Sequence, residues 1–232
     1  MSLITAVYVP TGIALSGDSR TTGTSTQTVV DPTSPTKTTV LQKDILLSDA
    51  TEKVFLVDGR FGVGTYGAAL VKRLPIAHYV AQLQASPGRQ SAADTASLAQ
   101  ELLNYFRALQ PIPASHFLVV GYDAAVPSVI GVDVSANRIE RFNVDPLSAS
   151  IQYGARWGGD SAIVGRLVSN TTFAFDVMNV QDAVDFSRHL VRSTIDQLRF
   201  EPRFPTVGGP IDTLVVTPSE AKFLVRKALH CD

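Results

Sequence analysis

Ser2 is the residue whose position in the chain suggests the most definite chemistry. A small residue after Met1 is what methionine aminopeptidases accept, so the mature chain could begin with Ser2. Ser2 would then carry a hydroxyl and a free α-amine, and an unperturbed α-amine with a pKa near ~8 can accept the hydroxyl proton around neutrality. A nucleophile joined to its own base is what catalysis by an N-terminal nucleophile requires.

Two β-hairpins are predicted to bring further charged groups toward this residue. The apolar runs Leu3–Val9 and Ile13–Leu15 flank the turn signal Pro10-Thr11-Gly12, and the second strand of this hairpin leads to Asp18 and Arg20. The second hairpin follows Lys53.

The second hairpin consists of the runs Val54–Val57 and Gly62–Thr65, which the turn Asp58-Gly59-Arg60 joins. Asp-Gly between two apolar runs is a strong hairpin signal. Its first strand starts immediately after Lys53 and its second strand leads to Gly67, so these two residues are expected at the same end of the hairpin.

These stretches resemble the catalytic β-type subunits of the proteasome and their bacterial relatives, a family of N-terminal-nucleophile (Ntn) hydrolases. The resemblance lies in the strand at the start of the chain, in Gly17-Asp18-Ser19-Arg20 and in the segment KVFLVDGRFGVGTYG from Lys53 to Gly67. If Met1 is removed, Asp18 falls at the family's distance from the N-terminus, and the spacing from Lys53 to Gly67 is also the family's.

The resemblance implies a role for each matching residue. Ser2 would attack an amide carbonyl, and Lys53 would stabilise the alkoxide and lower the pKa of the amine. Asp18 would pair with Lys53, while the Gly67 N–H would donate to the oxyanion. Arg20, Tyr66 and Asp160 are predicted to lie beside the bound substrate.

The resemblance weakens in the second half of the chain. The family carries a Ser after a strand, where this chain has Gly159, and an Asp and a Ser shortly before a Gly-Gly pair. Gly208-Gly209 is preceded here by Phe204-Pro205-Thr206-Val207, with neither residue. Asp160, Thr206 and Asp212 are the nearby groups that could substitute.

The order of predicted elements leads to a fold. Strands are followed by two helices, further strands, two more helices and two final strands. Since an antiparallel sheet must cover its apolar face, we expect an α+β protein that forms a four-layer αββα sandwich, with two antiparallel sheets flanked by helix pairs. The family resemblance implies the same fold.

Residues 21–52 are predicted to form an enlarged hairpin or loop within a single domain that spans residues 1–232. The stretch is rich in Thr, Ser, Gln and Pro, and it is about twice as long as the family's connection. Two interpretations stay open: a solvated and variable loop, and a loop that recognises substrate or faces a pore.

Composition excludes several classes of function. The net charge of −1 gives no reason to expect nucleic acid as a partner, and no apolar run approaches the ~20 residues of a membrane span. Neither a signal peptide nor a disulfide framework is visible, since Cys231 is the lone cysteine. We therefore expect a cytoplasmic protein without a cofactor or a metal; the histidines show no metal-ligand spacing and are His78, His116, His189 and His230.

The sequence thus predicts an Ntn amide hydrolase, a relative of threonine-type peptidases that acts on a peptide or another amide. The resemblance also implies a homo-oligomeric ring, with any unfoldase partner unknown. Two alternatives stay open: a catalytically inactive scaffold subunit, and an amidase or transpeptidase for a non-protein substrate.

Overall fold

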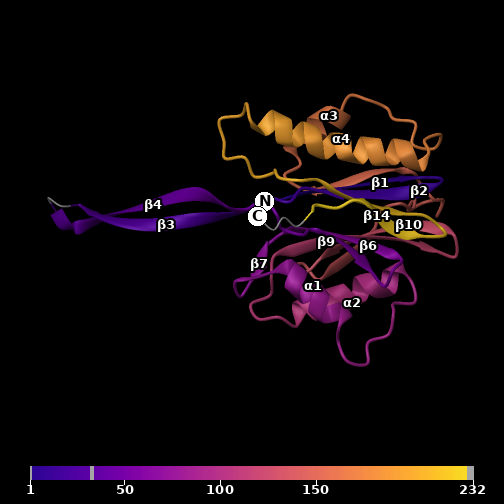
Figure 1. The fold of residues 1–232 in the computed structure, drawn as a ribbon, viewed down its shortest axis with the longest axis horizontal. Coiled ribbons are helices and arrows are strands. Elements are labelled where there is room, and N and C mark those ends of the chain that lie inside the picture. Colours follow the sequence, from indigo (N-terminus) through magenta and orange to yellow (C-terminus); the bar gives the residue numbers. More distant parts are fainter. Residues whose placement is uncertain (1, 32–33, 229–232) are drawn as a thin grey trace.

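The computed structural model describes residues 2–31 and 34–228 of the 232-residue chain. Predictions that concern Met1, His230 and Cys231 therefore lie outside the described residues. Figure 1 shows a body of packed sheets and helices from which one long ribbon of two strands projects.

Two five-stranded sheets form the body. The first has the order β12-β1-β2-β13-β14, with strands Gly154–Gly159, Leu3–Val9, Gly12–Gly17, Asp212–Val216 and Ala221–Val225. The second has the order β11-β10-β9-β6-β5, with strands Arg138–Arg141, Val126–Asp133, Ser115–Asp123, Phe61–Gly67 and Val54–Val57. All pairings within both sheets are antiparallel.

The two sheets pack face to face and share an apolar core. Ile4 and Leu15 from the first sheet pack in one cluster with Leu118 and Val120 from the second. All seven residues of β1 are buried, which fits a strand covered on both faces. β1 is therefore fixed firmly, and the residue that precedes it is fixed with it.

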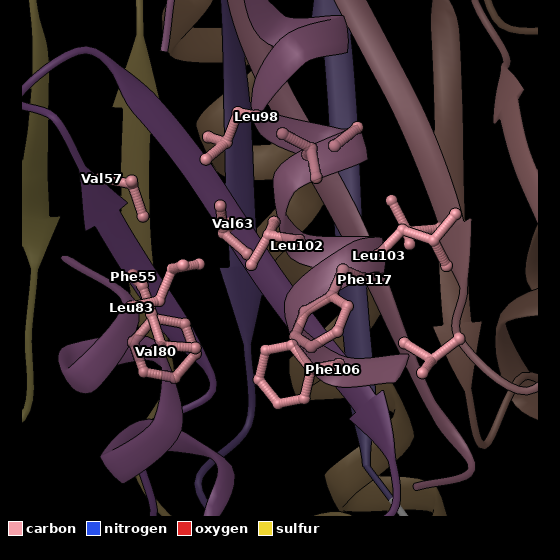
Figure 2. Close-up of a cluster of buried hydrophobic side chains, with 14 of the residues drawn as sticks. Phe55, Val57, Val63, Val80, Leu83, Leu98, Leu102, Leu103, Phe106 and Phe117 are labelled. Atoms are coloured by element: carbon pink, nitrogen blue, oxygen red, sulfur yellow. The ribbon is translucent and has the colours of Figure 1, made fainter. Parts of the chain in front are cut away.

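Helices pack against the other face of each sheet. α1 (Ile76–Gln84) and α2 (Thr95–Arg107) contribute to a cluster with β5, β6, β9 and β10. Figure 2 shows this cluster, in which Phe106 of α2 lies against Phe117 of β9, with ring centroids 4.7 Å apart. α4 (Val180–Leu198) lies along β1 and β2, and the short α3 (Ala162–Val168) packs on α4.

The predicted fold class is wrong. The protein is mostly β, with 39% of its residues in strands and 22% in helices, and it is not a four-layer αββα sandwich with helix pairs flanking two sheets. The described strands form several sheets, two of which have only two strands: β3 with β4, and β7 (Leu70–Val71) with β8 (Leu74–Pro75). The helices are also unequal, since α3 has seven residues and α4 has 19.

Two stretches account for this difference. The stretch 21–52 was expected as an insertion of hairpin or loop, and most of it is regular strand: β3 (Thr21–Asp31) and β4 (Ser34–Ser48). The stretch from Ala68 to Gln84 was expected as a helix interrupted at Pro75. Its first part instead forms the β7–β8 hairpin, and α1 starts after Pro75, because a proline lacks the N–H that an interior helical turn needs.

Candidate active site

Five strand ends meet at one place in the body. β1 and β2 form an antiparallel hairpin in which Ile4 pairs with Gly17, so the start of β1 lies beside the end of β2. β5 and β6 form a second hairpin, and the Thr65 amide donates to the Lys53 carbonyl at 2.9 Å where that hairpin opens. β12 ends against the start of β1, where Leu3 pairs with Gly159. The residues just beyond these ends are therefore neighbours.

Ser2 lies immediately before β1 and is only 4% exposed. Its carbonyl oxygen accepts a hydrogen bond from the Asp160 amide at 2.8 Å. Gly159 approaches so closely, at a φ of +102°, that a side-chain Cβ there would overlap the Ser2 carbonyl. Glycine is the residue that tolerates both the close approach and the positive φ, so β12 forms a tight seat for Ser2.

Asp18 connects the three segments around Ser2. Its Oδ1 accepts from the Leu3 amide and from Lys53 Nζ, both at 2.9 Å. Its Oδ2 accepts from the amides of Arg20 and Gly208, both at 3.0 Å. Asp18 is 1% exposed, so hydrogen bonds from these four donors replace the hydration of its carboxylate.

Ser2 and Leu3 are thus held at both polar atoms of the peptide group that joins them. The Ser2 carbonyl is bound by the Asp160 amide, and the Leu3 amide is bound by Asp18. The backbone on the C-terminal side of Ser2 therefore has a fixed orientation.

Lys53 is the positive charge of this cluster and is 3% exposed. Besides Asp18, its Nζ donates to the carbonyl oxygen of Arg20. Burial lowers the pKa of the Lys53 ammonium, although the negative charge of Asp18 opposes this shift. The predicted pair of Lys53 with Asp18 is present. The lysine is buried, whereas a lysine at an ordinary strand start would be solvated.

Gly67 presents a backbone donor on the Lys53 side of β6. Ala68 N–H donates to Ala114 O at 2.9 Å, and Gly67 is paired with Ser115. Neighbouring N–H groups on a strand point to opposite sides. From the alternation between Thr65 and Gly67 we infer that the Gly67 N–H, like that of Thr65, faces the side where β5 begins at Val54. Gly67 has a φ of +94°, so the regular strand ends at this residue.

A narrow pocket of about 10 Å³ lies beside Ser2. Its lining includes Ser2, Lys53, Thr65, Tyr66 and Ala69. This volume is close to the space that a single water molecule needs.

The other predicted substrate-binding residues make strong contacts within the protein. Arg20 forms a two-point ion pair with Asp49, with N–O distances of 2.7 and 2.8 Å, and also donates to Pro205 O at 3.2 Å. Those hydrogen bonds hold the pKa of the Asp49 carboxyl below its usual value. Arg20 thus secures the base of the β3–β4 ribbon to the body.

Tyr66 lines the pocket beside Ser2. Its ring stacks on His116 at 5.0 Å between centroids, and it covers Gly158 so closely that a Cβ there would overlap the ring. Burial raises the pKa of the Tyr66 hydroxyl. The ring is therefore held from two sides, and it gives the pocket a rigid wall.

Asp160 and Thr206 come together, as the sequence allowed. Thr206 Oγ1 donates to Asp160 Oδ2 at 2.5 Å, and Arg203 binds both carboxylate oxygens, at 2.5 and 3.1 Å. Burial raises the pKa of the Asp160 carboxyl, but the hydrogen bonds from Arg203 and Thr206 outweigh it, so the pKa lies below its usual value. Asp212 instead forms a buried ion pair with Lys227.

Sequence reasoning missed Arg203. It lies three residues before Thr206 in an irregular stretch, and neither periodicity nor a motif marks it. A positive partner for a buried Asp160 is the signal that could have suggested it, but the burial of Asp160 depends on how β12 packs against β1.

Comparison with family models finds no family that matches this chain. A search of curated proteins likewise finds no relative. Among the described residues, no helix has both the length and the apolar character needed to cross a membrane, and no group of three or more His, Cys, Asp or Glu side chains is arranged to hold a metal ion.

Proposed function

We propose that this protein is an Ntn amide hydrolase whose nucleophile is the hydroxyl of Ser2 after removal of Met1. The observation that carries the proposal is the convergence of Ser2, Asp18 and Lys53. These residues are far apart in the sequence, and a single buried carboxylate joins the strand that carries the first to the ammonium of the last. A solvated lysine and an ordinary turn aspartate would not require such burial.

The first half of the reaction forms an ester on Ser2. The free α-amine of Ser2 takes the hydroxyl proton while Oγ attacks the carbonyl carbon of the amide. The carbonyl oxygen becomes an oxyanion, for which the Gly67 N–H is the donor. When the C–N bond breaks, the ammonium of Ser2 returns the proton to the leaving amine.

The second half restores the enzyme. Water gives a proton to the α-amine and attacks the ester carbonyl, and the Ser2 oxygen leaves with that proton. The net reaction consumes one water and yields an acid and an amine. A transpeptidase would differ only in using a second amine in place of the water.

Lys53 supports both halves through its charge. A buried ammonium near the developing alkoxide lowers the cost of the negative charge, and the low polarity around it strengthens this effect. Asp18 keeps the ammonium in place and also holds Leu3, so the charge and the nucleophile are positioned by the same carboxylate.

The pocket favours a small group on the acyl side of the scissile bond. Its volume of about 10 Å³ leaves no room for a large aromatic side chain, so a small side chain fits best beside Ser2. This holds for a peptide and for a small amide alike, so both substrate classes belong to the proposal. Assembly into a ring and a cytoplasmic location stay predictions.

The test is amide turnover by the purified full-length protein and three variants. A panel of fluorogenic peptides and small amides with Ala, Leu or Phe before the scissile bond is offered to the wild type, Ser2→Ala, Ser2→Thr and Lys53→Met. We expect turnover of the Ala substrates that Ser2→Thr retains and Ser2→Ala loses, and that is about 10²-fold slower in Lys53→Met. Equal turnover by Ser2→Ala would reject the proposal, and a folded wild type without turnover of any substrate would favour the inactive scaffold.

A further inference from the structure

The β3–β4 ribbon leaves the body as an isolated two-stranded sheet (Figure 1). Its strands have 11 and 15 residues and pair antiparallel along their length. The described side chains from Thr24 to Thr28 and from Val40 to Asp44 are exposed on both faces of the ribbon. Two strands without a third strand or a covering element are marginally stable in water, so this length calls for a stabilising contact.

The two strands differ in how their outer edges are protected. Natural edge strands carry charges, prolines or bulges that prevent pairing with other chains. β4 has Lys43 and Asp44 in its exposed part, whereas Thr24–Val30 contains no charge and no proline. The segment also consists largely of β-branched residues, which suits it to strand pairing.

We propose that the outer edge of β3 pairs with β3 of a second copy of this chain. The two copies are related by a two-fold axis, so the strands run antiparallel and form a four-stranded sheet in the order β4-β3-β3-β4. This inference is independent of the proposed function, because it uses none of the residues around Ser2.

A second copy fits this edge better than an unrelated chain for two reasons. In a two-fold contact the same residues meet each other, which is favourable only if they do not repel, and Thr24–Val30 carries no charge. On one face, Thr24, Thr26 and Thr28 follow each other along the strand, and cross-strand threonine pairs stabilise antiparallel sheets.

The contact is confined to the outer edge of β3, which has 11 residues. β4 pairs with the opposite edge of β3, so the exposed side chains of Val40 and Leu41 lie outside the contact.

The first test measures mass in solution with charges placed on either strand. Sedimentation velocity at about 1–100 µM, which covers the weak end of the affinity range of protein interfaces, is applied to the wild type, to Thr26→Lys/Thr28→Lys, and to the control Val40→Lys/Gln42→Lys. The control adds the same charges at the registered partners, since Thr26 pairs with Gln42 and Thr28 with Val40. We expect the wild type to form a dimer or a larger assembly. The dissociation constant should be about tenfold higher for the β3 variant and unchanged for the β4 control.

The second test locates the contact by cross-linking. With Cys231→Ser as background, single cysteines are placed at each position from 24 to 28 and, as controls, from 40 to 44. In an antiparallel pair, at least one β3 position faces its own copy across the axis and forms a disulfide dimer under mild oxidation, while the β4 positions do not. A monomeric wild type overturns the proposal, and so does an assembly that the β3 charges leave intact or that cross-links only through β4.

Discussion

Gly159→Ala should damage both the stability of the protein and the placement of Ser2. Gly159 has a φ of +102°, and an added Cβ would overlap the Ser2 carbonyl oxygen and approach Leu3 Cα at 3.4 Å. A non-glycine residue in such a sparsely populated backbone region costs about 1–3 kcal/mol. Overpacking against backbone that cannot move aside adds about 1–3 kcal/mol. We therefore expect a loss of about 3 kcal/mol in the free energy of unfolding.

Gly165→Ala is the matched control. Gly165 lies in α3 with no atom within 4 Å of an added Cβ. Alanine is favoured over glycine in a helix by up to about 1 kcal/mol, so this variant should be as stable as the wild type or more stable.

The assay is urea unfolding of both variants, followed by reaction with a hydroxyl-directed probe at Ser2. Gly159→Ala should unfold at lower urea and react more slowly even where it is fully folded, because the Ser2–Leu3 peptide group has been displaced. If Gly159→Ala matches the wild type in stability and reaction rate, the tight seat of Ser2 between β12 and β1 is refuted.

Two further predictions concern the same surroundings, and a third concerns the start of α4. Lys53→Met should lower the rate of acylation at Ser2 by about 10²-fold, and it should cost about 3 kcal/mol of stability because Asp18 loses its charged partner; unchanged acylation in stopped-flow labelling would contradict this. The pKa of Asp160 lies below its usual 3.8, so its stabilising contribution is complete above that pH and is lost as the pH falls through the lower folded-state pKa. Asp160→Asn should therefore make the unfolding free energy depend less on pH in this acidic range. An equal dependence on pH in both proteins would count against this prediction. Asn179→Ala removes the side chain that caps α4, which should cost about 1 kcal/mol in urea unfolding; no change would show that the cap is not needed.

Local sequence signals predicted the elements that position the site. The hairpin with the turn Asp58-Gly59-Arg60 was confirmed: Val57 pairs with Phe61 across this turn, Asp58 and Gly59 both have positive φ, and the strand Val54–Val57 has the predicted bounds. The capping pair Asn179 and Asp182 was confirmed as the start of α4. Each of these signals acts within a few residues, so no tertiary information was needed.

Longer-range features escaped prediction for physical reasons. The length of regular strand in the ribbon was underestimated. A stretch rich in Thr and Ser does not alternate between apolar and polar residues, and this alternation is the pattern that indicates a half-buried strand. The ion pair of Arg20 with Asp49 and the contact of Arg203 with Asp160 depend on how separate segments pack. The fold class was wrong because an order of elements does not determine how much of the chain is strand.

The candidate site itself was predicted in part. The pairing of Lys53 with Asp18 and the proximity of both to the start of β1 agree with the expected arrangement. The resemblance that suggested it has no matching family model behind it. The catalytic roles of these residues therefore rest on their geometry and on the experiments.

The most direct measurement is the intact mass of the purified protein before and after treatment with a peptide epoxyketone, which bonds both to a hydroxyl and to an α-amine on the same residue. We expect a chain that lacks Met1 and gains one probe molecule, with no gain in Ser2→Ala. A wild-type chain that retains Met1, or that lacks Met1 and still gains no probe, would contradict the claim that Ser2 is an N-terminal nucleophile.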